Sequence, residues 1–151
     1  MANATQVIKT APRRFYEAVI IVHPDANLEN QKDLFRKNKG IIESFDGKVF
    51  SLETWGKRAL ANPIGKSRRA AYFHTLFEAN SQAIMELERT MRINDKVLRF
   101  MHTRLDERTP LNKHLENFKK GLAESAQRER EREAKIQARR AAFQAAAQGG
   151  A

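Results

Sequence analysis

The chain has 151 residues, and its 28 Lys and Arg against 18 Asp and Glu give a formal charge of +10. This length suits one domain with a tail, and the charge favours a polyanionic partner, with nucleic acid ahead of an anionic membrane. The sequence holds no cysteine, which excludes disulfides, thiolate metal sites and a cysteine nucleophile. We find neither a signal peptide nor a membrane span of roughly 18 apolar residues, so we expect a cytoplasmic protein.

The chain alternates between strand and helix patterns from residue 15 to residue 105. Residues 15–22 (FYEAVIIV) are rich in β-branched and aromatic side chains, which predicts a strand. After this strand the apolar residues take helical spacing, and Asp25 or Asn27 is placed to cap a helix. With a turn at Asp46-Gly47, the further predicted elements are strands at 48–55, 70–79 and 95–105 and helices at 25–45 and 81–93, the second capped by Asn80 or Ser81.

The predicted order β-α-β-β-α-β is that of the ferredoxin-like fold, in the α+β class. Each helix has a single apolar side to bury, so we expect both helices on one face of a four-stranded antiparallel sheet. The other face keeps apolar residues such as Val19 and Ile21. No RNP-like aromatic motif is present for stacking RNA bases there. We predict that a partner protein docks on this bare face, with the alternative that the C-terminal segment folds back over it.

The stretch at residues 53–73 (ETWGKRALANPIGKSRRAAYF) contains the predicted hairpin-like connection between the strands at 48–55 and 70–79. It holds five cations and no carboxylate between positions 57 and 69. Mutual repulsion of these cations is unfavourable, and a bound polyanion would remove it. Leu60 and Ile64 are expected to attach the loop to the body and Pro63 to restrict it, so that less ordering entropy is lost on binding. The alternative is chance enrichment of cations. The predicted RNA-binding residues are Arg13, Arg14, Lys57, Arg58, Lys66, Arg68 and Arg69.

An enzymatic function has little support in the sequence. The four histidines are scattered and show no metal-ligand spacing. Acylphosphatase-type chemistry on this fold needs a glycine-rich phosphate cradle after the first strand, whereas residues 23–30 (HPDANLEN) hold no glycine and two carboxylates. We therefore predict no catalytic residue, metal, cofactor or small-molecule substrate. An acylphosphatase-type enzyme and a regulatory RNA-binding module remain the alternatives.

Three blocks, YEAVIIVHPD, LETWGKRALANPI and RINDKVLRFM, resemble the bacterial small-subunit ribosomal protein family numbered six, in order and spacing, over residues 13–105. The resemblance implies a ferredoxin-like, non-enzymatic protein that binds the central domain of 16S ribosomal RNA in the platform. It also implies a heterodimer with the small-subunit protein numbered eighteen. Asn62 replaces the usual tyrosine of the family, and Ala59 and Gly65 also depart from its pattern. The matching loop positions are Lys57, Arg58, Leu60, Pro63 and Ile64.

The chain ends in a charged segment that is helix-prone after about residue 122. Leu111, Leu115 and Phe118 form a short apolar stripe, which we predict binds a partner protein or the bare sheet. The rest holds too few large apolar residues for a core, so we expect a fraying or disordered helix that RNA or a neighbouring protein orders. The predicted organisation is a flexible arm at 1–12, a ferredoxin-like ribosomal protein domain at 13–106 and a C-terminal extension at 107–151.

Overall fold

The structure is a computed structural model that describes residues 11–148. Contacts within the chain divide it into two units after Glu107, and each unit is described by itself. The predicted N-terminal arm at 1–12 lies almost wholly outside the described residues and stays a prediction.

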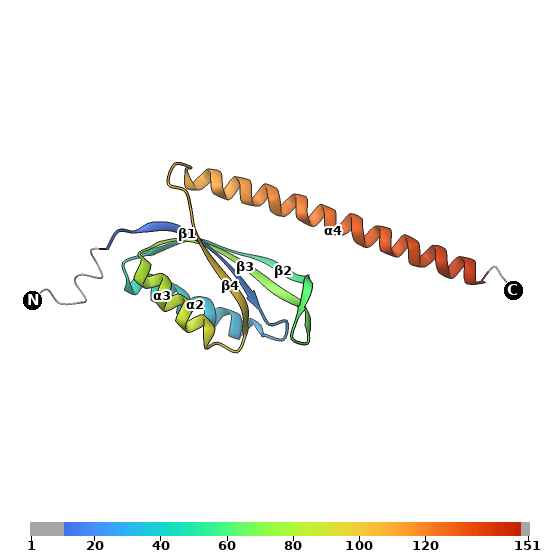
Figure 1. Ribbon diagram of the computed structural model, residues 1–151, viewed down its shortest axis with the longest axis horizontal. Helices are drawn as coiled ribbons and strands as arrows, with labels where there is room; N and C mark the ends of the chain where they lie inside the picture. The colour runs from blue at the N-terminus through green and yellow to red at the C-terminus, as the bar shows by residue number, and fades with distance from the viewer. Residues whose placement is uncertain (1–10, 149–151) are drawn as a thin grey trace, which may run out of the picture. The chain divides into compact units, whose positions relative to one another are not determined.

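The first unit has the predicted ferredoxin-like fold (Figure 1). Its four strands form one antiparallel sheet in the order β2-β3-β1-β4, and both helices lie on the same face of that sheet. The α+β prediction is therefore confirmed. The elements are β1 (Arg14–Val22), α2 (Leu28–Ser44), β2 (Lys48–Ile64), β3 (Ser67–Ala79), α3 (Ser81–Arg92) and β4 (Val97–Arg104).

The core lies between the sheet and the two helices. Alternation along β1 sends Ala18, Ile20 and Val22 into this core, while Val19 and Ile21 lie on the opposite face of the sheet. Burial of large apolar side chains contributes about 1.5–3 kcal/mol each to folding. The larger buried side chains of the same core cluster are Leu34 and Ile42 of α2, Phe73 and Phe77 of β3, and Leu87 and Met91 of α3.

Both helices begin at an asparagine cap. The side chain of Asn27 accepts a hydrogen bond from the backbone N–H of Asn30 at 2.8 Å, and Asn80 accepts one from Ala83 at 2.9 Å. An asparagine in this position satisfies a backbone donor at the helix start that lacks a helical partner. Of the predicted cap alternatives, the two asparagines therefore hold the positions.

The predicted turn at Asp46-Gly47 forms, and it requires its glycine. Asp46 has a φ of 65°, a left-handed conformation that Asp tolerates better than most residues. The N–H of Gly47 donates to the carbonyl of Ile42 at 2.8 Å. A Cβ atom at Gly47 would lie 2.5 Å from the backbone oxygen of Glu78, so no larger residue fits without displacement.

The predicted hairpin-like connection is present, but its loop is far shorter than expected, because β2 and β3 continue as paired strands through most of residues 56–69. Pairing extends as far as Ile64 with Ser67, so that only Gly65 and Lys66 form the turn. Gly65 has a φ of 57°, which glycine adopts without strain. Pro63 is tolerated because β2 is an edge strand, where a missing backbone donor is acceptable.

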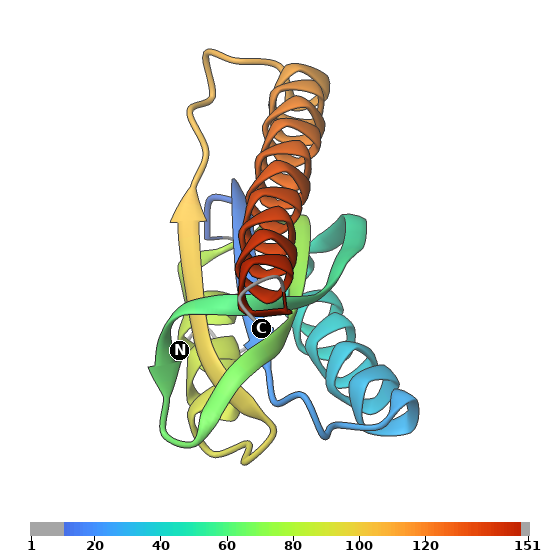
Figure 2. The ribbon, with the colours of Figure 1, turned by 90° about the vertical axis from the view of Figure 1, so that its right-hand side faces the viewer.

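The second unit contains a single described helix, α4 (Leu111–Gln148), of 38 residues (Figure 2). It begins well before residue 122 and runs without a break through Gly121. The structure thus has a regular helix where the sequence predicted a fraying or disordered one. Within the described part of the chain, no helix has an apolar stretch sufficient to cross a membrane.

Candidate nucleic-acid interface

The β2–β3 hairpin projects beyond the end of β1. Strand β1 pairs with β3 from Arg14 opposite Ala79 to Val22 opposite Ala71, so the residues of β3 before Ala71 do not pair with β1. Beyond β1, Oγ of Ser67 lies 3.4 Å from Nε2 of His23. The projecting ribbon is visible at the turn between β2 and β3 in Figure 1. From residue 54 to residue 70 the chain holds five cations and no carboxylate, and these are Lys57, Arg58, Lys66, Arg68 and Arg69.

The hairpin register distributes these cations over two faces. Residues directly opposite each other share a face and alternate along a strand, which places Lys57 and Arg69 on one face and Arg58 and Arg68 on the other. Nη2 of Arg69 donates to the carbonyl of Lys57 at 3.3 Å, and Nε of Arg58 donates to the carbonyl of Trp55 at 3.4 Å. These hydrogen bonds hold two guanidinium groups against the ribbon.

Four of the five cations carry their charge to solvent without a compensating carboxylate. Lys57, Lys66, Arg68 and Arg69 are exposed, and no acidic side chain within residues 11–148 forms an ion pair with any of them. Positive charges that are close together and uncompensated raise the local potential and attract anions. The ribbon is therefore suited to a polyanion such as a nucleic-acid backbone.

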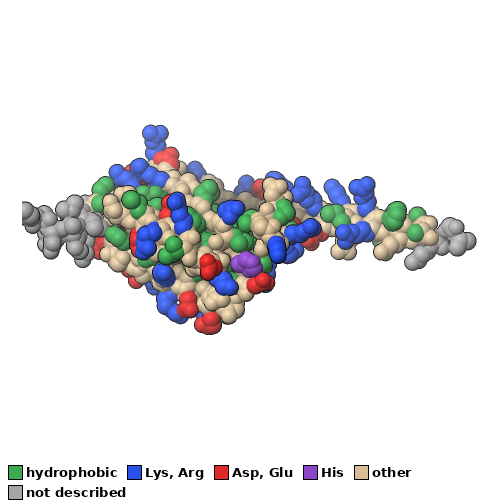
Figure 3. Space-filling view, turned by 60° about the horizontal axis from the view of Figure 1, so that its bottom comes forward, with side chains coloured by type: hydrophobic (Ala, Val, Ile, Leu, Met, Phe, Trp, Pro, Cys, Tyr) green, Lys and Arg blue, Asp and Glu red, His purple; other side chains and the backbone are tan. Residues whose placement is uncertain are grey.

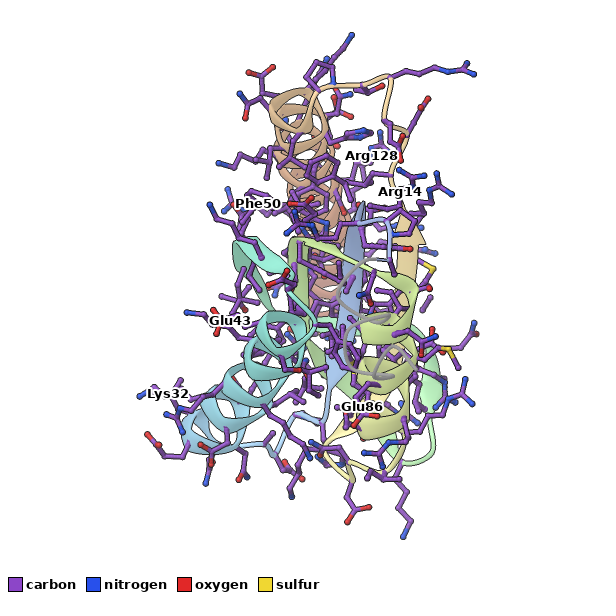
Figure 4. All side chains as sticks on the ribbon, turned by 90° about the vertical axis from the view of Figure 1, so that its left-hand side faces the viewer. Arg14, Lys32, Glu43, Phe50, Glu86 and Arg128 are labelled. Carbon is purple, nitrogen blue, oxygen red and sulfur yellow. The ribbon has the colours of Figure 1, made fainter. Side chains whose placement is uncertain are left out.

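Arg13 and Arg14 lie away from the hairpin. Arg14 pairs with Ala79, ten residues along β3 from Arg69, which is about 33 Å at the rise of a strand. Figure 4 labels Arg14 at this other end of the sheet. Nε of Arg13 lies 3.7 Å from Glu78, and Nε of Arg14 lies 3.1 Å from Glu107. The structure does not bring these two arginines to the hairpin cations, and it gives each a carboxylate partner.

The sheet face opposite the helices carries an aromatic cluster that the sequence analysis missed. The ring of Trp55 stacks on Tyr72, with centroids 5.9 Å apart at 7°, and on His74, with centroids 6.0 Å apart at 24°. Val19 lies opposite His74 in the register, and Ile21 lies opposite Tyr72. The spacing of Tyr72 and His74, two apart in one strand, was a signal that they share a face. Trp55 was harder to place, because a register shift lies between Thr54 and Gly56.

The predicted protein-binding residues fall into two groups. Val19 and Ile21 are half-buried on the sheet face opposite the helices, where His74 and Leu76 are fully buried. Leu111, Leu115 and Phe118 are half-buried on α4 in the second unit, and their spacing of four and three places them on one side of that helix. Each group alone forms an apolar strip that a partner protein would cover.

His74 and His102 each lie beside a different carboxylate. Nε2 of His74 lies 3.2 Å from a carboxylate oxygen of Glu17. Burial lowers the pKa of His102, and the carboxylate of Glu88, 3.6 Å from its Nδ1, opposes that shift. Within residues 11–148, no three His, Asp or Glu side chains are grouped so that they could hold a metal ion.

Fold and hairpin together define a ferredoxin-like α+β protein with a cationic β-ribbon. The family model described as "Ribosomal protein S6" matches residues 15–104. The chain belongs to the ribosomal protein S6 family. It is accordingly a structural constituent of the bacterial small ribosomal subunit, in the cytoplasm, and is not an enzyme.

Individual relatives agree with the family match. The chain is 70% identical over 121 residues to small ribosomal subunit protein bS6 of Bdellovibrio bacteriovorus, which covers 80% of each chain. It is 42% identical over 96 residues to bS6 of Geobacter metallireducens, covering 64% of this chain and 81% of that one. The crystal structure of 30S ribosomal protein S6 from Thermotoga maritima superposes with a TM-score of 0.57 at 29% identity, covering 62% of this chain and 89% of that chain. The resemblance stated from three sequence blocks is thus confirmed.

Proposed function

We propose that the protein binds 16S ribosomal RNA through the cations of the β2–β3 hairpin. The observation that carries this proposal is the uncompensated charge of Lys57, Lys66, Arg68 and Arg69 on a ribbon that projects past β1. Each phosphate contact with such a cation releases condensed counterions, which favours association most strongly at low salt. RNA in the central domain, on the platform of the subunit, is the target that family membership suggests.

The hairpin prepares its cations for this contact. Strand pairing and the two-residue turn fix the backbone, so that little ordering entropy is lost when RNA binds. With arginines on both faces, Arg58 and Arg68 on one and Arg69 on the other, the ribbon can bind phosphates on either side. Each guanidinium can bind a phosphate through two parallel hydrogen bonds. Recognition then depends on the shape and backbone of the RNA rather than on its bases.

The other predicted RNA-binding residues are expected to contribute less. Arg13 and Arg14 each lie beside a carboxylate, Glu78 and Glu107 respectively. Binding a phosphate would require these arginines to exchange one anionic partner for another, which gains little free energy.

We also propose that the sheet face opposite the helices binds the small-subunit protein numbered eighteen. The stacked rings of Trp55 and Tyr72 and the apolar side chains of Val19 and Ile21 provide rigid contact area of the kind that dominates protein interfaces. Leu111, Leu115 and Phe118 of α4 offer a further apolar strip. Replacing Val19 and Ile21 by aspartate should abolish co-purification of this partner. Undiminished co-purification with the folded variant would contradict the assignment of the face.

Incorporation into small subunits tests the RNA proposal. The variant replaces Lys57, Arg58, Arg68 and Arg69 by glutamine, and the matched control replaces Lys32, Arg36, Lys39 and Arg92 of the helical layer. Both lose four positive charges, so an effect of net charge alone would be shared. Cells that express each tagged protein are lysed, and the share of it that sediments with small subunits is measured on density gradients.

The hairpin variant should remain in the light fractions, while the control sediments with the subunits as the unaltered protein does. Equal incorporation of the two variants, both shown to be folded by circular dichroism, would refute the role of the hairpin. An unaltered protein that itself stays in the light fractions would point to an RNA-binding module outside the ribosome.

A further inference from the structure

Helix α4 lies outside residues 15–104, the part of the chain that the family model matches. Its outer half is strongly basic, and Lys and Arg side chains stand along it in the space-filling view (Figure 3). From residue 130 to residue 147 every residue is exposed. The cations of this half are Arg128, Arg130, Arg132, Lys135, Arg139 and Arg140.

Four of these cations form one stripe along the helix. Arg128, Arg132, Lys135 and Arg139 follow one another at intervals of four, three and four residues. At 100° per residue they lie within an arc of about 60°, and at 1.5 Å per residue they span about 16 Å. We name these four residues the α4 stripe.

The carboxylates of the same half lie off the stripe. At the same 100° per residue, all three carboxylates lie outside the 60° arc, and these are Glu129, Glu131 and Glu133. Glu131 accepts a hydrogen bond from Nε2 of Gln127 at 3.4 Å, on its side away from the stripe. Arg128 does lie 3.8 Å from Glu124, but both side chains are more than half exposed, and such a pair contributes little. The stripe therefore presents a nearly continuous positive surface.

The outer half lacks the features that a protein or membrane partner would need. A helix that docks in a protein groove or lies in a membrane interface presents apolar residues at i, i+3, i+4 and i+7. Beyond Leu122 the large apolar residues are only Ile136 and Phe143, exposed by 51% and 78%. The net positive charge of this outer half of α4 complements a polyanion. With Phe143 as the one aromatic residue there, it also lacks the stacking platform that single-stranded nucleic acid requires.

We propose that the α4 stripe is a second RNA-binding element, which binds the phosphate backbone of double-stranded RNA. Its straight and regularly spaced cations suit a stiff duplex, which proteins bind mainly through shape and backbone. The stripe adds to the protein a contact that lies outside the matched family region, residues 15–104.

The test uses the full chain with all five hairpin cations, Lys57, Arg58, Lys66, Arg68 and Arg69, already replaced by glutamine, so that the hairpin carries no positive charge. In this background the stripe variant replaces Arg128, Arg132, Lys135 and Arg139 by glutamine. The matched control replaces Lys113, Lys120, Arg130 and Arg140, which lie on α4 but outside the stripe. Binding to an RNA duplex of about 16 base pairs, to one of its single strands and to anionic vesicles is measured over a range of salt concentrations.

The stripe variant should bind the duplex at least about tenfold more weakly than the control at about 0.1 M salt. The slope of log K against log salt should fall by about 2.8 to 3.6, from 0.7 to 0.9 for each lost contact. Glutamine and arginine have similar helix propensities, so circular dichroism should show an unchanged helix. If helix content does fall, alanine replaces glutamine at the same four positions, because alanine removes the charges and favours the helix.

Several results would overturn the proposal. Equal losses of duplex affinity in the stripe variant and the control would show that RNA responds to the total charge of α4 and not to the stripe. Binding that is unchanged in both would show that α4 does not hold RNA. Tighter binding to the single strand or to vesicles than to the duplex would assign the stripe to a different partner. Because the hairpin is neutral in every arm, these results are independent of the function proposed for it.

Discussion

The helical layer, which consists of α2 and α3, and the β2–β3 hairpin differ in how their cations are paired with carboxylates. In α2 and α3, five of the six cations form an ion pair with a carboxylate one turn away, and Lys37 is the exception. Figure 4 shows Lys32 and Glu43 pointing from α2 away from the sheet. Hydrogen bonding to Arg89 lowers the pKa of Glu86 and raises that of Arg89. The pairs are Lys32–Glu29 at 3.3 Å, Arg36–Asp33 at 2.6 Å, Lys39–Glu43 at 3.7 Å, Arg89–Glu86 at 2.7 Å and Arg92–Glu88 at 3.4 Å.

In the hairpin, Lys57, Lys66, Arg68 and Arg69 have no such partner among residues 11–148. A surface of close ion pairs is nearly neutral beyond the screening length of about 8–10 Å, so it attracts a polyanion weakly. The hairpin keeps a positive electrostatic potential. Its cations also repel one another, and a bound phosphate would reduce this repulsion. The position of the charges, rather than their total, thus distinguishes the two regions.

The largest effect is expected from the core beneath the helices. Leu87 of α3 is 1% exposed, and Leu87→Ala should lower the free energy of unfolding by about 2–5 kcal/mol. Leu60 of the hairpin is half-buried, so Leu60→Ala should cost less. Urea unfolding of both variants measures the difference. A larger loss at Leu60 would show that the hairpin, and not the helical layer, carries the stability.

Gly47, in the turn before β2, and Gly65, in the turn of the hairpin, extend the comparison to the backbone. Gly47→Ala places a Cβ 2.5 Å from the oxygen of Glu78, and we expect a loss of about 3 kcal/mol. Gly65→Ala meets open space and strains only the φ of 57°, for a loss of about 1 kcal/mol. Thermal unfolding should rank the two in this order, and the reverse order would contradict the account of both turns.

The helical side of the sheet should also respond to pH. Burial holds the pKa of His102 below its usual value of 6.5, so the unfolded chain binds a proton at a higher pH than the folded one does. Its contribution to stability is full above pH 6.5 and is lost as the pH falls from there to the lowered pKa. His102→Leu should remove this loss of stability at low pH. Urea unfolding of the unaltered protein and of the variant at several pH values measures the difference in the free energy of unfolding. Parallel curves for the two proteins would contradict it.

Single surface charges give the smallest effects, and here the two regions should differ in kind. Arg36→Gln breaks an exposed ion pair and should change the free energy of unfolding by less than about 1 kcal/mol, with RNA affinity unchanged. Arg69→Gln should leave stability almost unchanged but lower the salt slope of RNA binding by about 0.7 to 0.9. Filter binding at several salt concentrations measures both slopes. Equal slopes would remove the distinction between paired and unpaired cations.

Local sequence signals predicted the elements whose causes are local. The caps Asn27 and Asn80, the Asp46-Gly47 turn and the apolar stripes of both helices all act within a few residues, and the structure has each of them. The five cations, too, were visible in the sequence as one run without a carboxylate.

The continuation of the hairpin was not predictable in this way. Gly56, Pro63 and Gly65 are typical of loops, and strand pairing through them depends on partners far along the chain. Register shifts at three points of β2 also disrupt the simple alternation of side chains. For the same reason the sequence did not show that the cations lie on two faces, with Lys57 and Arg69 on one and Arg58 and Arg68 on the other.

The salt dependence of 16S RNA binding tests the central claim most directly. It is measured for the unaltered protein, for the variant with glutamine at Lys57, Arg58, Arg68 and Arg69, and for the helical-layer control lacking Lys32, Arg36, Lys39 and Arg92. We predict that the slope of log K against log salt falls by about 2.8 to 3.6 in the hairpin variant and remains unchanged in the control. An unchanged slope in the folded hairpin variant, or an equal fall in the control, would contradict the account.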